Sequence, residues 1–338
     1  MKILITGICG FVGSSLAQIL CEDDQLDIHG VDDLSFGYKQ RIEDIENKVI
    51  FHQKDVNSFC LSEETSFDII INAAAVAPLP DNQVNHSRSL AMNVGTLGSL
   101  VDFMIKTGCK KMIHFSSSAV YEGLSSRICS GHKVGDKLEP HLMYPISKYL
   151  SEVYLQAQST VYGLDIIALR LFNLYGPRQD YFRKQPPLLG YLIKNIIQKK
   201  PVTLFASPEA KRDYVFILDL INFIKIILNQ SYIEKRYKAV NIGSGSAYSV
   251  YDLVEKLEKI SGEKLIYTKG NKKKFWDKYP SMFENKVPLP EDIVQNEVDK
   301  VSFCNLDDTI EQFKWSPEIK IESGLKMCFD YAKKIISA

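Results

Sequence analysis

One tyrosine and one lysine stand four residues apart, shortly after a serine-rich segment. This spacing puts Tyr144 and Lys148 on one face of a helix. Of the seventeen tyrosines only Tyr144 has a lysine four residues on, and the segment 115–121 (FSSSAVY) precedes the pair, directly after a predicted strand. A tyrosine with an unperturbed pKa of about 10 is a poor base, but a nearby ammonium stabilises the phenolate. The pair can therefore take a proton from a substrate hydroxyl.

Three glycines near the N-terminus form a second pattern with a chemical use. Gly7, Gly10 and Gly13 follow a predicted strand and open a predicted helix, and Asp32 ends the next strand. Glycine permits a tight turn and lets the backbone approach a pyrophosphate, while the helix N-terminus offers N–H groups and partial positive charge. An acid at the end of the second strand can accept both ribose hydroxyls and repels a 2′-phosphate. The pattern predicts a dinucleotide site that favours NAD over NADP.

A parallel sheet would position these residues, and the first half of the chain has the pattern of one. Apolar strand candidates alternate with helical patterns, notably 88–106 and 145–162, which is typical of βαβ units covered on both faces. We expect an α/β fold: a Rossmann-type doubly wound parallel sheet with a smaller C-terminal mixed α/β lobe. The predicted strands are 2–6, 27–32, 49–53, 67–72, 111–116 and 165–170. Helices are predicted in the second half at 188–199, 217–228 and 250–261.

The glycine spacing GxxGxxG resembles the extended branch of the short-chain dehydrogenase/reductase superfamily, specifically its NAD-dependent epimerase/dehydratase family. Further motifs follow in the family's order: Asp55-Val56, then Asn72–Ala75 (NAAA), then Asn93-Val94, with Thr96 replacing a glycine. The resemblance implies three catalytic residues: Ser117, Tyr144 and Lys148. It implies that NAD contacts Gly7, Gly10, Phe11, Val12, Gly13, Asp32, Asp55, Val56, Ala73, Ala74, Ala75, Asn93, Ser116, Tyr144 and Lys148.

Motifs in the second half resemble those that surround a nucleotide-diphosphate sugar in this family. They are 170–178 (RLFNLYGPR), 212–215 (RDYV) and 241–245 (NIGSG). The implied substrate contacts are Pro78, Ser117, Ser118, Asn173, Arg178 and Arg212. The family's second phosphate-binding arginine is absent, because 288–292 reads PLPED and no arginine follows Arg236. Either a lysine from 269–278 replaces it or the sugar carrier is held differently.

The resemblance implies an NAD-dependent nucleotide-sugar C4 epimerase. Tyr144 and NAD⁺ would oxidise the sugar 4-hydroxyl, and the 4-keto sugar would turn and be reduced on its other face. Family 4,6-dehydratases carry Asp-Glu where this chain has Ser118-Ala119, which cannot transfer those protons. A 5,6-elimination, a decarboxylation or a net oxidation stays open. The non-enzyme alternative is an NAD-binding regulator or scaffold, against which the complete catalytic set argues.

The composition shifts near residue 175, which predicts an organisation into two parts, and the resemblance implies two copies of the chain. Residues 1–175 are expected to form the NAD-binding Rossmann domain and 176–338 the nucleotide-sugar-binding lobe, with some segments returning to the first domain. A homodimer built from the helices 88–106 and 145–162 is implied.

Composition excludes several other classes of function. The chain has 338 residues, in which 41 Lys+Arg balance 41 Asp+Glu, so no charge favours nucleic acid or an anionic membrane. No apolar run approaches the ~18 residues of a membrane span, and glycines interrupt the stretch after Lys2 that could pass for a signal peptide. The seven cysteines form no CxxC pair and no His/Cys cluster has zinc-like spacing. We expect a cytoplasmic protein without a metal.

Overall fold

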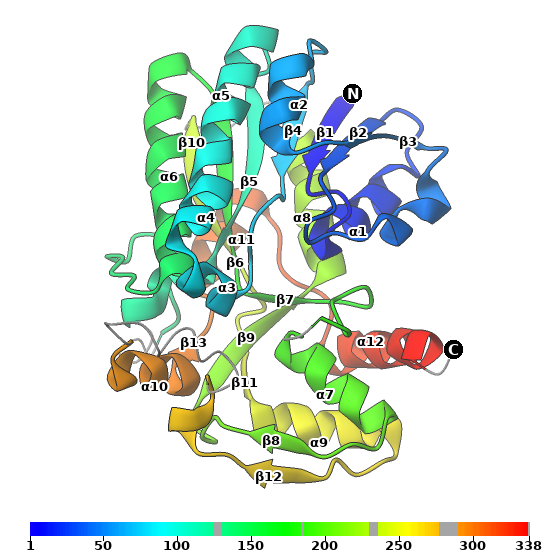
Figure 1. The fold of residues 1–338 in the computed structure, drawn as a ribbon, viewed down its shortest axis with the longest axis vertical. Coiled ribbons are helices and arrows are strands. Elements are labelled where there is room, and N and C mark those ends of the chain that lie inside the picture. The colour runs from blue at the N-terminus through cyan, green and yellow to red at the C-terminus, as the bar shows by residue number, and fades with distance from the viewer. Residues whose placement is uncertain (125–129, 184–185, 230–235, 277–288, 337–338) are drawn as a thin grey trace. The chain divides into compact units, whose positions relative to one another are not determined.

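The chain folds into two compact units, each built from separate stretches of sequence (Figure 1). The computed structural model describes residues 1–124, 130–183, 186–229, 236–276 and 289–336. Unit 1 comprises residues 1–120, 140–171 and 224–240. Unit 2 comprises residues 121–139, 172–223 and 241–338.

Unit 1 is built on a seven-stranded sheet with the order β10-β6-β5-β4-β1-β2-β3. Strands β1 to β6 run parallel, and their order reverses between β1 and β4, which is where doubly wound sheets bind ligands. The predicted Rossmann-type fold is confirmed. The strands are β1 (Lys2–Thr6), β2 (Asp27–Asp32), β3 (Val49–Gln53), β4 (Ile69–Asn72), β5 (Lys111–Ser117), β6 (Asp165–Leu171) and β10 (Tyr237–Ile242), whose last two residues belong to unit 2.

Helices cover both faces of this sheet (Figure 1). On one face, Phe59, Leu100 and Leu155 from three helices pack against Leu4 and Ile70 in a single apolar cluster. These helices are α2 (Val56–Ser62), α5 (Thr96–Thr107) and α6 (Met143–Tyr162). Helix α1 (Phe11–Leu20) lies on the other face, and the short helices α3 (Leu79–Val84) and α4 (His86–Leu90) precede α5. Because both faces are covered, the strands are almost continuously apolar.

Unit 2 has a small mixed sheet. Strand β9 (Lys211–Phe216) is parallel to β7 (Asn173–Tyr175) and β13 (Val301–Ser302) and antiparallel to β11 (Ala247–Ser249). A separate parallel pair joins β8 (Val202–Leu204) to β12 (Tyr267–Lys269). The helices are α7 (Leu188–Ile197), α8 (Ile217–Asn229, continuing into unit 1), α9 (Val250–Ser261), α10 (Glu291–Asp299), α11 (Asp307–Phe313) and α12 (Ile321–Ile336).

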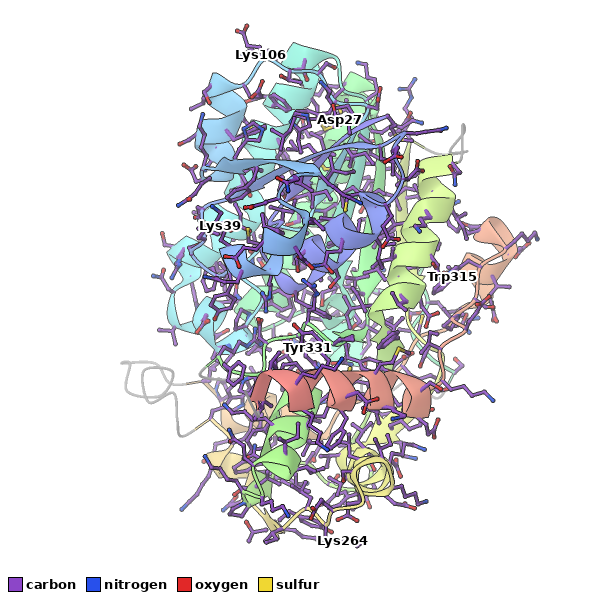
Figure 2. All side chains as sticks on the ribbon, turned by 90° about the vertical axis from the view of Figure 1, so that its right-hand side faces the viewer. Asp27, Lys39, Lys106, Lys264, Trp315 and Tyr331 are labelled. Carbon is purple, nitrogen blue, oxygen red and sulfur yellow. The ribbon has the colours of Figure 1, made fainter. Side chains whose placement is uncertain are left out.

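Aromatic side chains fill much of the interior of unit 2. Trp315 lies edge-on to Phe223, with ring centroids 5.2 Å apart, and the ring of Tyr331 of α12 lies 6.5 Å from the ring of Tyr181; Trp315 and Tyr331 are labelled in Figure 2.

In the described part of the chain, no helix has both the length and the apolar character needed to cross a membrane.

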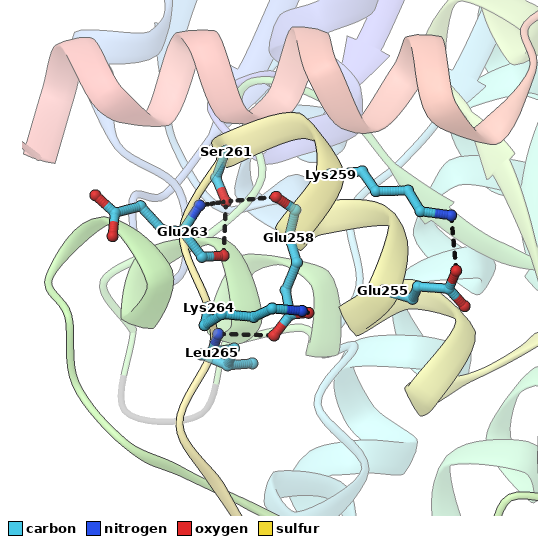
Figure 3. A network of polar contacts seen from close by, with 7 residues as sticks. All are labelled: Glu255, Glu258, Lys259, Ser261, Glu263, Lys264 and Leu265. Carbon is cyan, nitrogen blue, oxygen red and sulfur yellow. Dashed lines mark hydrogen bonds and ion pairs between the residues drawn. The ribbon is translucent and has the colours of Figure 1, made fainter.

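Helix α9 illustrates how local sequence sets the ends of an element. Ser249 and Asp252 form a capping box at its start, each side chain bonding the backbone N–H of the other. At its end Gly262 adopts φ +72, a left-handed conformation that glycine adopts readily. Glu258 then accepts hydrogen bonds from Lys264 Nζ at 2.6 Å and from the backbone N–H of Leu265 at 2.9 Å (Figure 3). These contacts direct the chain toward β12.

Candidate active site

The turn between β1 and α1 excludes side chains at two of its glycines. A Cβ atom on Gly13 would lie 2.3 Å from the carbonyl oxygen of Gly7 and 2.7 Å from Cα of Ile8. Gly7 itself has φ +67, and its Cβ would lie 2.9 Å from Cα of Ala74. The glycines thus let β1, α1 and the alanine segment after β4 approach one another closely, as the sequence pattern predicts.

The N-terminus of α1 is left open for an anion. Its N-cap residue is Gly10, and no side chain in the described residues caps it. The N–H groups of the first turn, which includes Phe11 and Val12, have no earlier helical carbonyl to bond, and the helix dipole adds partial positive charge. This cradle of glycine and free N–H groups fits a dinucleotide pyrophosphate.

Asp32 ends β2 with its carboxylate turned toward the same turn. Oδ2 accepts a hydrogen bond from the backbone N–H of Cys9 at 2.9 Å, and Oδ1 accepts one from Leu34 at 2.8 Å. Burial raises the pKa of Asp32, and these two N–H donors oppose that rise. Each oxygen keeps a lone pair after one hydrogen bond, so the carboxylate fits a ribose diol as well as holding the turn.

The next predicted cofactor contacts have roles in the fold. Asp55 is the N-cap of α2, and its carboxylate accepts hydrogen bonds from the backbone N–H of Asn57 at 3.1 Å and of Ser58 at 3.0 Å. Hydrogen bonds with Ser58 lower the pKa of Asp55. Val56 is buried behind it. The segment Ala73-Ala74-Ala75 is half-buried, and the backbone N–H of Ala74 donates to Thr6 Oγ1 at 3.1 Å. A set of small side chains therefore lines the end of β4.

Asn93 lies in a π-helical turn, Ala91–Gly95, that interrupts the single helix expected at 88–106. Its Oδ1 accepts from the backbone N–H of Val76 at 2.8 Å, and its Nδ2 donates to Asn82 Oδ1 and to Ser147 Oγ, each at 3.0 Å. The Asn93 carbonyl accepts from Ser151 Oγ at 2.9 Å. Asn93 was predicted to contact the cofactor, and the structure shows it joining the loop after β4 to α6.

Tyr144, Lys148 and Ser117 come from two adjacent elements of unit 1. Tyr144 lies in the first turn of α6 and Lys148 one turn further on, while Ser117 ends β5. Lys148 is buried, and its Nζ donates to the carbonyl oxygen of Phe115 at 2.8 Å. The hydroxyl of Ser117 lies near enough to the phenol of Tyr144 to lower its pKa. The three predicted catalytic residues are therefore brought together.

The environment of this set changes its proton affinities. Burial lowers the pKa of Lys148 to about 8, and the carboxylate of Glu152 opposes that fall. Burial raises the pKa of Tyr144, and the hydrogen bond with Ser117 opposes that rise. The expected lowering of the phenol pKa is thus not produced by the chain alone. The positive ring of NAD⁺ would have to add its charge to that of the Lys148 ammonium to favour the phenolate.

Several residues beside this set have contacts that the sequence motifs do not predict. Ser116 was predicted to contact NAD, yet its hydroxyl donates at 2.5 Å to Glu152 Oε1, which also accepts from Arg170 Nε at 2.9 Å. His114 is buried, and its Nδ1 accepts a hydrogen bond from Asn72 Nδ2 at 3.1 Å. Glu152 belongs to none of the motifs. The one sign of it in the sequence is its position four residues after Lys148, which places both residues on one face of the helix.

The predicted substrate contacts of unit 1 lie at element ends. Pro78 is the N-cap of α3, and Ser118 begins the 3₁₀ segment Ser118–Leu124 directly after Ser117. Ser117 Oγ accepts from the backbone N–H of Ala119 at 3.1 Å, which orients the hydroxyl.

The predicted substrate contacts of unit 2 are Asn173, Arg178 and Arg212. Asn173 starts β7 and donates to the carbonyl oxygen of Asp213 at 2.7 Å, and Arg178 is half-buried in the turn after β7. Arg212 donates to the backbone carbonyls of Lys300 and of Glu297, the latter at 2.6 Å. Arg212 was predicted to supply charge to a diphosphate, and in this structure its guanidinium holds the end of α10.

The stretch that replaces the expected second arginine forms the start of α10. Glu291 and Asp292 occupy its first turn, where negative charge is favoured by the helix dipole. Of the lysines in 269–278, Lys272 forms an ion pair with Asp299 at the other end of α10. Residues 277–288 lie outside the described residues.

The chain is similar to proteins that are described as UDP-sugar epimerases. A UDP-glucuronate 4-epimerase of Thermodesulfobacterium geofontis is 27% identical over 98% of this chain and 96% of the relative. A protein of Bacillus subtilis described as an uncharacterized UDP-glucose epimerase is 27% identical over 78% of this chain and 83% of the relative. Among solved structures, a UDP-glucose 4-epimerase of Thermotoga maritima with UDP-glucose matches 99% of this chain and 100% of its own with a TM-score of 0.83 at 24% identity, which supports the fold.

One protein-family model matches the sequence over residues 3–243. The match covers more than half of the chain and includes the glycine turn and the Tyr144–Lys148 pair. Its description names NAD, which confirms the expected cofactor, and the resemblance drawn from the motifs is confirmed with it. The chain is a member of the NAD-dependent epimerase/dehydratase family.

Proposed function

We propose that this enzyme is a nucleotide-sugar C4 epimerase. The observation that carries the proposal is the meeting of Tyr144 and Lys148 on α6 with Ser117 at the end of β5, in the same unit as the dinucleotide turn. Relatives described as UDP-sugar 4-epimerases support the choice of reaction and of a uridine diphosphate carrier.

The chain's own residues handle the proton of the reaction. NAD, when bound, supplies a reversible hydride acceptor. Tyr144 takes the proton of the sugar 4-hydroxyl and later returns it, after the 4-keto sugar has turned its other face. Ser117 holds the same sugar oxygen by a hydrogen bond, and the ammonium of Lys148 favours the phenolate of Tyr144. Because each turnover returns its proton, no net acid or base is consumed.

The remaining predicted contacts are part of the proposal. The glycine turn and Asp32 hold the pyrophosphate and adenosine ribose of NAD, with Asp55, Val56, Ala73, Ala74, Ala75, Asn93 and Ser116 around the rest of the cofactor. Pro78, Ser118, Asn173, Arg178 and Arg212 are proposed to line the nucleotide sugar. The guanidinium of Arg212 bonds the carbonyls of Glu297 and Lys300, so binding phosphate would use its remaining N–H groups or exchange these bonds. We further propose that residues 1–175 form the NAD-binding part and that residues 176–338 supply most of the nucleotide-sugar-binding part.

A homodimer and a cytoplasmic location complete the proposal. Helix α6 carries the exposed apolar stripe Leu150, Val153, Ala157 and Val161, whose spacing places it on one helix face. Such a stripe suits a second copy of the chain.

Six cysteines are described and each is a free thiol, which supports a reducing compartment; Cys129 lies outside the described residues.

The test is a panel of UDP-, GDP-, CDP- and dTDP-sugars incubated with the NAD-loaded enzyme. Mass spectrometry and NMR of the products should show an isomer of unchanged mass inverted at C4, with only transient absorbance at 340 nm. A product lighter by water or carbon dioxide, or stable absorbance at 340 nm, would replace the proposal with dehydration, decarboxylation or net oxidation. Binding of NAD without turnover of any sugar would favour the regulator or scaffold.

A further inference from the structure

Helix α6 meets three consecutive residues of β5. Lys148 Nζ donates to the carbonyl of Phe115 at 2.8 Å, Ser116 Oγ donates to Glu152 Oε1 at 2.5 Å, and the hydroxyl of Ser117 lies near enough to the phenol of Tyr144 to lower its pKa. Ser116 thus lies between the two β5 residues that contact the catalytic pair, and its partner is one helical turn beyond Lys148. The bond between Ser116 and Glu152 fixes the register of α6 along β5.

Glu152 joins this contact to the next strand. Its Oε2 accepts from Arg170 Nη2 at 2.7 Å, its Oε1 accepts from Arg170 Nε at 2.9 Å, and Tyr237 Oη of β10 lies 3.5 Å from Oε2. Both Glu152 and Arg170 are buried, with relative exposures of 4% and 5%. The cluster of Ser116, Glu152 and Arg170 therefore ties α6 to β5 and β6 at the level of the catalytic lysine.

Stability alone does not call for a buried ion pair at this place. Replacing such a pair by apolar residues of similar volume is often neutral or stabilising, because desolvation of both charges opposes their attraction. The surroundings are strongly apolar, since Leu155 of α6 and Ile166 of β6 belong to the unit's main apolar cluster. A charged cluster one turn from Lys148 thus requires another explanation.

The geometry points to Glu152 as a positioning residue of the reaction, acting on Lys148 through the Ser116–Glu152–Arg170 cluster. This inference rests on the proposed use of Lys148 and Tyr144. The cluster holds the turn of α6 that carries Lys148 against β5, and its carboxylate keeps the buried ammonium charged at neutral pH.

The groups around Lys148 leave Glu152 as the acid that acts on it. On its own helix the neighbours are Tyr144 and Glu152. From β5 comes His114, whose pKa is held well below its usual value by burial and by the charge of Lys148. Arg170 of β6 and Tyr237 of β10 reach Glu152 itself. Burial raises the pKa values of Tyr144 and Tyr237, so neither phenol adds a negative charge beside Lys148 before NAD binds.

The test compares two substitutions that break the same ion pair from opposite sides. Glu152→Gln removes the negative charge and leaves the arginine, so the pKa of Lys148 should fall by about one unit. Arg170→Gln removes the positive charge and leaves Glu152, so the pKa of Lys148 should rise by a similar amount. The measurement is an NMR titration of ε-¹³C-lysine in the NAD-loaded protein without sugar, with the Lys148 signal assigned by its loss in Lys148→Met. Shifts in the same direction, or no shift, would overturn the inference.

Ser116→Ala tests the positional part and does not unpair a buried charge. We expect kcat to fall about tenfold with KM unchanged, because a less firmly held Lys148 supports the transition state less well without changing how the sugar binds, while the Lys148 titration stays in place. Ser159→Ala is the matched control, since Ser159 is also buried on α6 and donates to Leu164 O at 2.7 Å, away from the site. Equal kcat values for the two variants would refute positioning by Ser116. Opposite Lys148 shifts in a protein that turns over no sugar would refute the proposed function alone.

Discussion

The ammonium of Lys148 donates to the backbone carbonyl of Phe115 at 2.8 Å. This hydrogen bond holds the buried ammonium against β5, two residues before Ser117. Its pKa, lowered to about 8 by burial, lies well below that of an exposed lysine. Below pH 8 the side chain is charged and favours the phenolate of Tyr144; above it the charge is lost. We predict that kcat declines as the pH rises through about 8, measured as a pH–rate profile at saturating sugar.

Lys148→Arg provides the control for this pH dependence. A guanidinium stays charged throughout the range, so any activity that remains in the variant should lack the decline near pH 8. The same alkaline limb in both proteins would assign it to another group.

Tyr144→Phe tests the proton transfer itself. The substitution removes one oxygen and keeps the ring, so the turn that holds NAD is untouched. We expect kcat to fall by about 10²–10⁴-fold, the usual contribution of a positioned acid or base, with NAD still bound. Cofactor content is measured by chromatography after denaturation. Near-normal turnover would remove Tyr144 from the mechanism.

The sequence predicted the sheet well, because its strands are local patterns, and the structure places Ser117, Tyr144 and Lys148 on two adjacent elements as the motifs predict. The strands Lys2–Thr6 and Asp27–Asp32 have the predicted bounds. Helix 88–106 was predicted as continuous, and the structure breaks it at a π-helical turn. Asn93 in that turn is bonded to Val76 and Ser147, far away in the sequence, so no local pattern reveals the break.

The residues that support the site were the least predictable. Glu152 acquires its role from Ser116 and Arg170, on two strands that only the folded sheet brings beside α6. Arg212 was predicted from its motif to meet a diphosphate, but its bonds to the carbonyls of Glu297 and Lys300 depend on how α10 packs. A motif identifies a residue type and a spacing, whereas its hydrogen-bond partners come from tertiary structure.

Gly13→Ala should damage both the fold and cofactor binding. The added Cβ meets the Gly7 carbonyl oxygen at 2.3 Å, and backbone atoms cannot move aside as a flexible side chain does. We expect a loss of about 1–3 kcal/mol in the free energy of unfolding, the usual result of overpacking, and weaker NAD binding. Gly135→Ala is the control, because its Cβ would have nothing within 4 Å. Equal melting temperatures for both variants would contradict the close approach.

The apolar stripe on α6 predicts a charge-sensitive dimer. Val153→Glu places a carboxylate in the middle of the stripe, where a second copy would have to desolvate it. We expect the variant to be monomeric by size-exclusion chromatography with light scattering, with an unchanged circular dichroism spectrum. Leu61→Glu is the matched control, since Leu61 on α2 is 81% exposed and outside the stripe. A monomeric parent protein, or a dimeric Val153→Glu, would refute this interface.

Asp32→Ala should weaken NAD more than NADP. Loss of charge-assisted hydrogen bonds to the ribose diol is worth about 1.5–3 kcal/mol, so Kd for NAD should rise about tenfold to a hundredfold. The variant also releases the backbone N–H of Cys9, which loosens the turn for both cofactors, but only NADP gains from removing a negative charge near its 2′-phosphate. Calorimetric titration of each cofactor measures the difference. Asp33→Ala is the control, because the Asp33 carboxylate bonds only Ser35 among the described residues and is exposed. Equal losses for NAD and NADP in Asp32→Ala would place the ribose elsewhere.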